Sequence, residues 1–89
     1  MKELYLEITY RHGRAIAAYL YLPREAQDKS LRTSKAPGGL LIDYTHEGKP
    51  IGIEITTPSK TTVVTVNRVL KNLGFPAITQ ADLAPLRAA

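Results

Sequence analysis

The segment from Gly38 to Ile55 constrains the fold of this chain more than any other. It holds two apolar and β-branched runs, Leu-Leu-Ile-Asp-Tyr and Ile-Gly-Ile-Glu-Ile, on either side of a polar stretch that contains Gly48. Two strand-like runs that flank a short glycine-containing reversal are typical of an antiparallel hairpin. The sequence therefore predicts a β-hairpin in this segment, but the segment does not indicate any chemical reaction.

The strand register of this hairpin follows from the placement of one carboxylate. A three-residue loop, His46 to Gly48, would put Glu54 on the same face as the apolar side chains of the first strand. The other register leaves Asp43, Gly52 and Glu54 together on the opposite face and creates three apolar pairs: Leu40 with Ile55, Ile42 with Ile53, and Tyr44 with Ile51. Burying an unpaired carboxylate costs several kcal/mol, more than a choice between turns. We therefore expect the second register.

Period-two alternation predicts further strands before the hairpin. Leu4 to Tyr10 and Ala15 to Leu22 are expected to form a first hairpin around Arg11-His-Gly-Arg14, with Gly13 at positive φ and Pro23 ending the second strand. In that second strand Ile16, Ala18, Leu20 and Leu22 share one face. The polar stretch Arg24 to Ser30 reads as a loop. Leu31 to Lys35 is expected to be a short strand with Leu31 and Thr33 facing inward, before a turn at Ala36 to Gly39.

After Pro58 the period changes to that of a helix. We expect Ser59 to be the N-cap of a helix that ends near Leu73, with Gly74 as the C-terminal stop and an apolar stripe formed by Val63, Val66, Leu70 and Leu73. The β-branched run from Thr61 to Val66 leaves open whether this segment begins as a strand. Thr79 is expected to cap a last short helix, Gln80 to Leu86, in which Pro85 fits only where the helix has already ended.

These elements predict an α+β fold, a small antiparallel sheet of four to five strands built from hairpins. One C-terminal helix packs on a face, followed by a short terminal helix or arm. The 89 residues suit a single domain, with residues 1–57 forming the β part and residues 58–89 the helix and arm. No cysteine is present, so neither disulfides nor thiolate metal sites are expected. No signal peptide or membrane span is recognised, which favours a cytoplasmic location.

The hairpin also resembles a known family. The spacing of Gly38, Asp43, Gly48 and Gly52-Ile53-Glu54-Ile55, with Tyr19-Leu-Tyr-Leu-Pro23 upstream, is similar to the domain of unknown function 2283 family over about Leu4 to Thr57. The resemblance implies a small bacterial β-rich domain without an assigned activity, some of whose relatives look like partners of small toxin-type proteins. This chain differs in having basic and threonine residues after the second strand, and the segment from Ser59 onward looks like an addition.

The residues that could carry chemistry have simple structural interpretations. Asp43 and Glu54 could act as an acid and base pair, but a solvated sheet face explains them as well. Two histidines on separate turns, His12 and His46, do not make a metal site, even with Glu47 nearby. The hydroxyls of Ser59, Thr61 and Thr62 have no neighbouring histidine in the sequence that could act as a base. We therefore interpret these residues as helix caps and β-branched structural residues and not as nucleophiles. We therefore expect no enzyme activity, no cofactor and no metal.

Three functions remain as hypotheses. The first is a homo-oligomeric protein-interaction domain, because one helix covers only one face of the sheet; its expected contact residues are Tyr19, Tyr21, Phe75, Leu83 and Leu86, with Phe75 to Leu86 as a docking arm. The second is a nucleic-acid-binding or antitoxin-like partner of a small toxin-type protein. It rests on a net charge of +4 and on a possible stacking platform of tyrosines 5, 10, 19, 21 and 44 with Arg11, Arg14 and Arg32. A hydrolase that uses Asp43 and Glu54 is the third.

Overall fold

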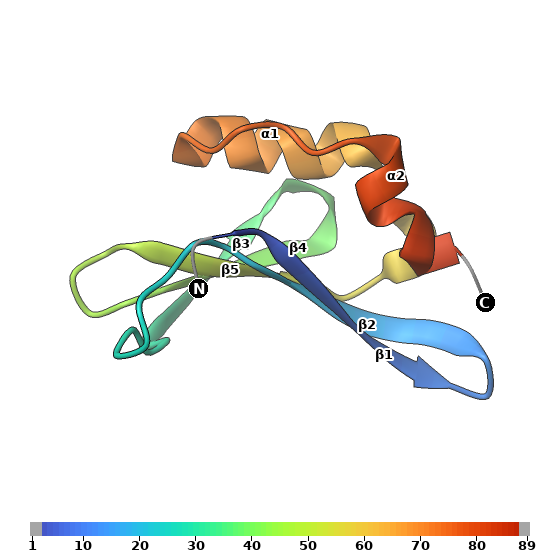
Figure 1. Cartoon of the computed structure of the whole chain (residues 1–89), viewed down its shortest axis with the longest axis horizontal. Helices are drawn as coiled ribbons and strands as arrows, with labels where there is room; N and C mark the ends of the chain where they lie inside the picture. The colour runs from blue at the N-terminus through green and yellow to red at the C-terminus, as the bar shows by residue number, and fades with distance from the viewer. Residues whose placement is uncertain (1–2, 88–89) are drawn as a thin grey trace.

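A five-stranded antiparallel sheet with helical segments on one side forms the molecule (Figure 1). The computed structural model describes residues 3–87, so residues 1–2 and 88–89 of the two predicted parts lie outside it. The strands are β1 (Tyr5–Arg11), β2 (Arg14–Tyr21), β3 (Arg32–Ala36), β4 (Leu40–Tyr44) and β5 (Pro50–Ile55). Their order across the sheet is β1-β2-β5-β4-β3, which places β5 at the centre and β1 and β3 at the edges. The predicted α+β class is confirmed.

The first hairpin turns at His12 and Gly13, which both have positive φ, 52° and 76°. A two-residue turn of this kind matches the twist of the strands on either side, and glycine adopts it without strain. The predicted reversal is therefore confirmed. Ile16 lies close to the hairpin tip and keeps 46% of its surface exposed, because this end of the hairpin projects beyond the helical cover (Figure 1).

The predicted register of the second hairpin is confirmed over most of its length. Leu40 pairs with Ile55 and Ile42 with Ile53, but Tyr44 pairs with Pro50 instead of Ile51. The register shifts between Asp43 and Tyr44 because the tip closes tightly: the Thr45 amide donates to the Lys49 carbonyl at 2.9 Å and the Gly48 amide to the Thr45 carbonyl at 3.0 Å. The predicted Tyr44–Ile51 pair is therefore wrong, although Ile51 is fully buried.

The third strand exists, but the faces predicted for it are wrong. Ser34 pairs with Ile42 and Thr33 with Asp43, so Thr33 lies on the face away from the helices. Leu31 precedes the strand and is 67% exposed. A short polar strand has too few apolar residues to define its inward face from the sequence, and pairing with β4 decides it.

The main helix, α1 (Val63–Leu73), begins later than predicted. Thr62 is its N-cap and accepts a hydrogen bond from the Thr65 amide at 3.2 Å, whereas Ser59 lies in a 3-10 turn, Pro58–Lys60. The Thr61 hydroxyl donates to the Thr57 carbonyl at 2.9 Å and holds this turn in place. The run from Thr61 to Val66 therefore enters a helix and not a strand. Gly74 ends the helix with φ of 86°, as predicted.

The C-terminal segment packs onto the rest of the chain. The helix α2 (Gln80–Leu83) has Thr79 as its cap, as predicted, but it ends at Leu83, and a 3-10 turn, Ala84–Arg87, accommodates Pro85. The Asn67 side chain bonds both backbone groups of Ile78, at 3.0 and 2.8 Å. These contacts anchor the segment to α1 and so to the sheet.

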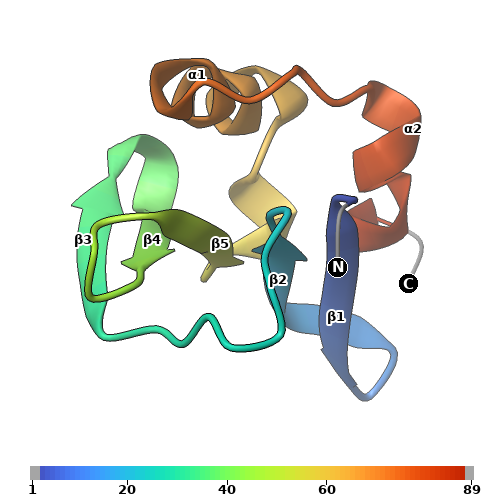
Figure 2. The same ribbon diagram turned by 60° about the vertical axis from the view of Figure 1, so that its left-hand side comes forward.

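The hydrophobic core lies between α1, the C-terminal segment and one face of the sheet. The three inner strands contribute alternate buried residues to it, the two edge strands pack partly buried residues against it, and α1 contributes the stripe around Val66, Val69 and Leu70. Ile78, Leu83 and Leu86 of the C-terminal segment complete the cluster. The helical segments all lie on this one side (Figure 2), so no helix within residues 3–87 covers the opposite face of the sheet.

Candidate functional site: the open face of the sheet

The strand register arranges the side chains of the uncovered face in two rows that cross all five strands. The first row consists of Tyr5, Tyr21, Gly52, Asp43 and Thr33. The second row consists of Glu7, Tyr19, Glu54, Leu41 and Lys35. We call these ten residues the open face. They alternate along each strand with the residues that point into the core, as side chains on a pleated sheet must.

Three tyrosines form a ridge on the β1–β2 half of the open face. The rings of Tyr19 and Tyr21 meet edge to face with centroids 4.7 Å apart, and those of Tyr5 and Tyr21 lie 5.6 Å apart. These distances are within the range in which aromatic pairs attract each other. The Arg24 guanidinium stands 5.6 Å from the Tyr21 ring centre. We call Tyr5, Tyr19 and Tyr21 the tyrosine ridge.

Tyr19 extends across the central strand to reach Asp43 on β4. Its hydroxyl donates to one carboxylate oxygen of Asp43 at 2.7 Å, and the Thr33 hydroxyl donates to the other at 2.6 Å. The ring passes directly over Gly52, where a Cβ atom would come within 2.0 Å of the Tyr19 hydroxyl. Gly52 is therefore the residue that lets a side chain of β2 bond one of β4. This contact gives a structural reason for the glycine in Gly-Ile-Glu-Ile.

Hydrogen bonds to carboxylates also affect the ionisation of the ridge. Partial burial raises the pKa of Tyr19 well above its ordinary value, and the hydrogen bond to Asp43 and the charge of Asp43 raise it further. Desolvation likewise raises the pKa of Tyr21, with a contribution from its bond to Glu7 at 3.2 Å. Both hydroxyls therefore remain protonated donors near neutral pH.

The charge of the open face is mainly negative. Glu7, Asp43 and Glu54 supply three carboxylates, against two cations, the Lys35 ammonium group at one edge and the Arg24 guanidinium above the Tyr21 ring. The Glu54 carboxylate is half-buried and has no hydrogen bond or ion pair to any of residues 3–87. A surface with this charge repels phosphate groups. It is thus a poor platform for stacking nucleic-acid bases.

The wider stacking platform expected from the sequence does not assemble. Tyr10 donates its hydroxyl to the Pro85 carbonyl at 2.9 Å, and Tyr44 packs against the core with Arg32 5.5 Å from its ring centre. Both side chains therefore have partners away from the open face. Arg11 and Arg14 stand at the tip of the first hairpin, beyond the two rows.

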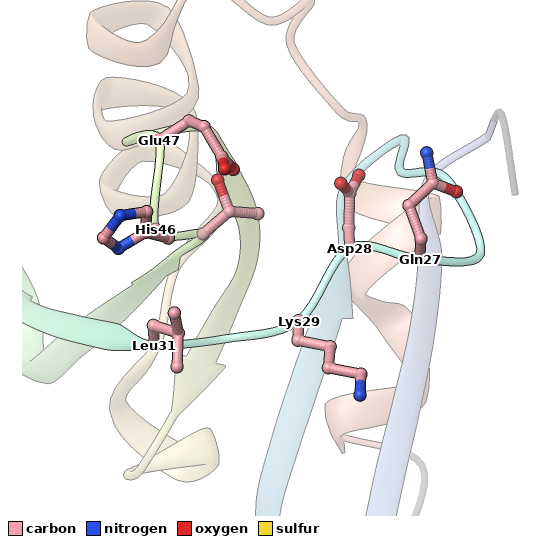
Figure 3. Close-up of a pocket in the computed structure, with 7 residues that line it drawn as sticks. Gln27, Asp28, Lys29, Leu31, His46 and Glu47 are labelled. Atoms are coloured by element: carbon pink, nitrogen blue, oxygen red, sulfur yellow. The ribbon is translucent and has the colours of Figure 1, made fainter.

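A shallow hollow lies between two loops at one end of the sheet (Figure 3). Its volume is about 230 Å³; Gln27, Asp28 and Lys29 line it from the loop after β2, and His46 and Glu47 from the tip of the second hairpin. Lys49 pairs with Asp28 at 2.5 Å. This hydrogen bond from Lys49, with another from the Glu25 amide, lowers the pKa of Asp28.

The other candidate chemical groups are apart from one another. His12 lies in the turn of the first hairpin and His46 in that of the second, and the two hairpin tips are at opposite ends of the sheet (Figure 1). No cluster of three or more potential metal ligands occurs among residues 3–87. The hydroxyls of Thr61 and Thr62 are used in the turn and cap at the start of α1. Asp43 and Glu54 do share the open face as predicted, in different rows.

The five residues predicted for interaction fall into two groups. Tyr19 and Tyr21 are on the open face. Phe75 packs against the core beside a hollow of about 450 Å³ that Leu4 and Leu6 also line. Leu83 and Leu86 keep only 5% and 4% of their surface exposed. The predicted docking arm, Phe75 to Leu86, thus covers the chain's own core, and these two leucines have little surface to offer a partner.

Sequence reasoning missed the importance of two open-face residues. Glu7 and Lys35 lie on predicted strands, but their places in the second row depend on pairing between strands distant in sequence. The alternation of Tyr19 and Tyr21 with buried leucines was the available signal for the ridge.

Comparisons with known proteins identify no relative. No protein-family model matches the chain, and neither does any curated protein or solved structure. The resemblance to the domain of unknown function 2283 family therefore stays a prediction. Within residues 3–87, no helix has both the length and the apolar character that crossing a bilayer requires.

Proposed function

We propose that this chain is a non-catalytic protein-interaction module that forms a homo-oligomer through its open face. The observation that carries the proposal is the one-sided cover of the sheet: the helical segments bury one face, and the tyrosine ridge and Leu41 remain on the other. Clustered aromatic residues that lie outside the core of a small domain are typical of interaction surfaces.

The size of the open face is compatible with a stable interface. Five strands about 4.8 Å apart make a surface roughly 20 Å wide, and strands of five to eight residues make it of similar length. With tyrosine side chains standing on it, such a surface offers several hundred Å² per partner, against roughly 800 Å² in a typical specific interface. A second copy that covered the whole face would therefore form an interface at the lower end of the size range of specific complexes.

Sedimentation equilibrium of the wild type and of two variants tests this proposal. We expect the wild type to approach twice the 9.8 kDa mass of one chain at micromolar concentration, and Leu41→Lys to remain a monomer because it buries an unpaired ammonium group at the interface. Val64→Lys is the matched control, since Val64 is 63% exposed on α1. A wild type that is monomeric at all concentrations, or a Val64→Lys variant that dissociates as readily as Leu41→Lys, would overturn the proposal.

Nucleic-acid binding is a second candidate, through the helical side and not through the tyrosines. Residues 55–81 contain Lys60, Arg68 and Lys71 and no acidic residue, whereas residues 3–54 contain seven basic and seven acidic residues. The positive net charge is thus concentrated in the helical part, where phosphates would be attracted.

A salt titration separates this candidate from the first. Binding to a duplex or single-stranded probe should weaken steeply as salt is added, and the double change Arg68→Ala with Lys71→Ala should weaken it further. Lys29→Ala, a change in an exposed loop, is the control. An absence of binding even at low salt would remove this candidate and leave the proposed self-association untouched.

A further inference from the structure

We infer that two copies of the chain pack open face to open face about a two-fold axis that runs parallel to β5. This inference rests on the self-association proposed above and specifies its geometry. Because β5 is the central strand, such an axis places β1 and β2 of one copy over β3 and β4 of the other. Each row of the open face then lies over the same row of the partner.

The shape of the open face fits this arrangement. Tyr5 and Tyr21 stand on the β1–β2 half, while the β4–β3 half carries the shorter side chains Asp43, Leu41 and Thr33. The axis along β5 places Tyr21 of each copy over the partner's Asp43 and Tyr5 over the partner's Thr33. At the centre the Tyr19 ring of each copy lies over its own Gly52, so the two rings face each other across the axis between sheets that are about 10 Å apart.

The charges at the two edges are also complementary in this arrangement. Glu7 on β1 and Lys35 on β3 occupy the two ends of the second row. Each Glu7 then lies opposite the partner's Lys35, and the two long side chains together can span a gap of about 10 Å. Both residues are exposed, and Lys35 has no hydrogen bond or ion pair to any of residues 3–87. The dimer would gain two ion pairs, one at each edge.

Glu54 gives the most distinctive prediction of this geometry. It lies on the central strand, so the axis brings it opposite the partner's Glu54. Its carboxylate has no partner among residues 3–87, and two like charges that approach each other weaken association. Removing this charge should therefore strengthen the dimer, the opposite of what removing a favourable contact would do.

A two-fold axis across the strands is the competing arrangement. It would place the β1–β2 half of one copy over the β1–β2 half of the other, so that tyrosines would meet tyrosines. It would also leave a gap between the two β4–β3 halves, which carry shorter side chains. It would place Glu7 over the partner's Tyr5 and Glu54 over the partner's Gly52, so no carboxylate of the two rows would lie opposite the partner's Lys35. Both the shape and the charge of the open face thus favour the axis along β5.

Charge reversal tests the inference. The dissociation constants of Glu7→Lys, Lys35→Glu and the double variant are compared with that of the wild type by sedimentation equilibrium, with folding checked by circular dichroism. We expect each single reversal to weaken the dimer roughly tenfold, because both edge pairs become repulsive, and the double variant to return to about the wild-type value. Glu47→Lys and Lys71→Glu, the same changes away from the open face, should have little effect.

Glu54→Gln provides the second readout. We expect it to tighten the dimer roughly fivefold, whereas an axis across the strands predicts no change. The inferred axis would be overturned if the double variant had a dissociation constant raised by both single effects together. It would also be overturned if Glu54→Gln left the dissociation constant unchanged. A wild type that does not dimerise would instead overturn the proposed function, so the two failures are distinguishable.

Discussion

At the scale of single residues, Gly52 has the clearest physical role. The Tyr19 ring occupies the space that a side chain at this position would need, and the ring is held there by its bond to Asp43. The glycine therefore does not serve a turn, because it lies inside β5. It allows a contact between two strands that are not neighbours.

The substitution Gly52→Ala tests this role. We expect a loss of about 1–2 kcal/mol in the free energy of unfolding, because the Tyr19 ring must move and its hydrogen bond to Asp43 is lost. The measurement is urea denaturation, repeated in a Tyr19→Ala background. There the same change should cost little, since the clashing ring is gone. An equal cost in both backgrounds would show that Gly52 acts through some other contact.

Tyr19 should also make the stability of the protein depend on alkaline pH. Its pKa is raised in the folded state from the ordinary value of 10.0, so the folded chain binds this proton more tightly than the unfolded chain. The stabilisation is therefore complete below pH 10 and is lost as the pH rises above it.

Urea denaturation at about pH 8 and about pH 11 measures this effect. We expect the unfolding free energy of the wild type to fall more over this interval than that of Tyr19→Phe. Tyr5→Phe, which removes an exposed phenol that has no hydrogen bond to any of residues 3–87, should behave like the wild type. If Tyr19→Phe lost as much unfolding free energy between the two pH values as the wild type, Tyr19 would not be the source of the pH dependence.

At the scale of elements, the start of α1 can be tested directly. Thr62 accepts the Thr65 amide hydrogen bond, and Ser59 lies one turn earlier in the chain. We expect Thr62→Ala to lower the free energy of unfolding by about 1 kcal/mol and Ser59→Ala to change it by less than about 0.5 kcal/mol. Urea denaturation of the two variants side by side decides the point. A larger effect at Ser59 would restore the N-cap predicted from the sequence.

The elements also show what the sequence could and could not predict. The register of β4 and β5 was predictable because Glu54 cannot enter the core unpaired, a local constraint of several kcal/mol. The change in register at Tyr44 was not predictable, because it depends on hydrogen bonds at the hairpin tip. Ser59 and Thr62 are both adequate caps, and only the turn at Pro58–Lys60 selects between them.

At the scale of the whole molecule, the C-terminal segment illustrates a second limit. Its apolar residues were recognised, but an amphipathic segment does not reveal whether it covers its own sheet or that of a partner. The bonds from Asn67 to Ile78 and from Arg87 to the Pro58 carbonyl at 2.7 Å fix it to its own chain. The surface that remains for a partner is consequently the opposite face of the sheet.

The division of the sheet into a covered and an open face is the basis of the functional proposal. One layer of helices suffices for the core of so short a chain, and the second face remains available for another molecule. The two predicted interaction residues on that face, Tyr19 and Tyr21, were identifiable from their alternation with Leu20 and Leu22. Their charged neighbours, which set the geometry of association, required the strand order.

The most direct test of this account is a backbone amide NMR spectrum recorded from low micromolar to millimolar protein. We expect concentration-dependent shifts to cluster on the open face, around Tyr19, Leu41 and Glu54, while the exposed side of α1 around Val64 and Arg68 stays unchanged. Spectra that do not change with concentration, or changes confined to α1 or to the β1 edge, would contradict the claim that a second copy covers the open face.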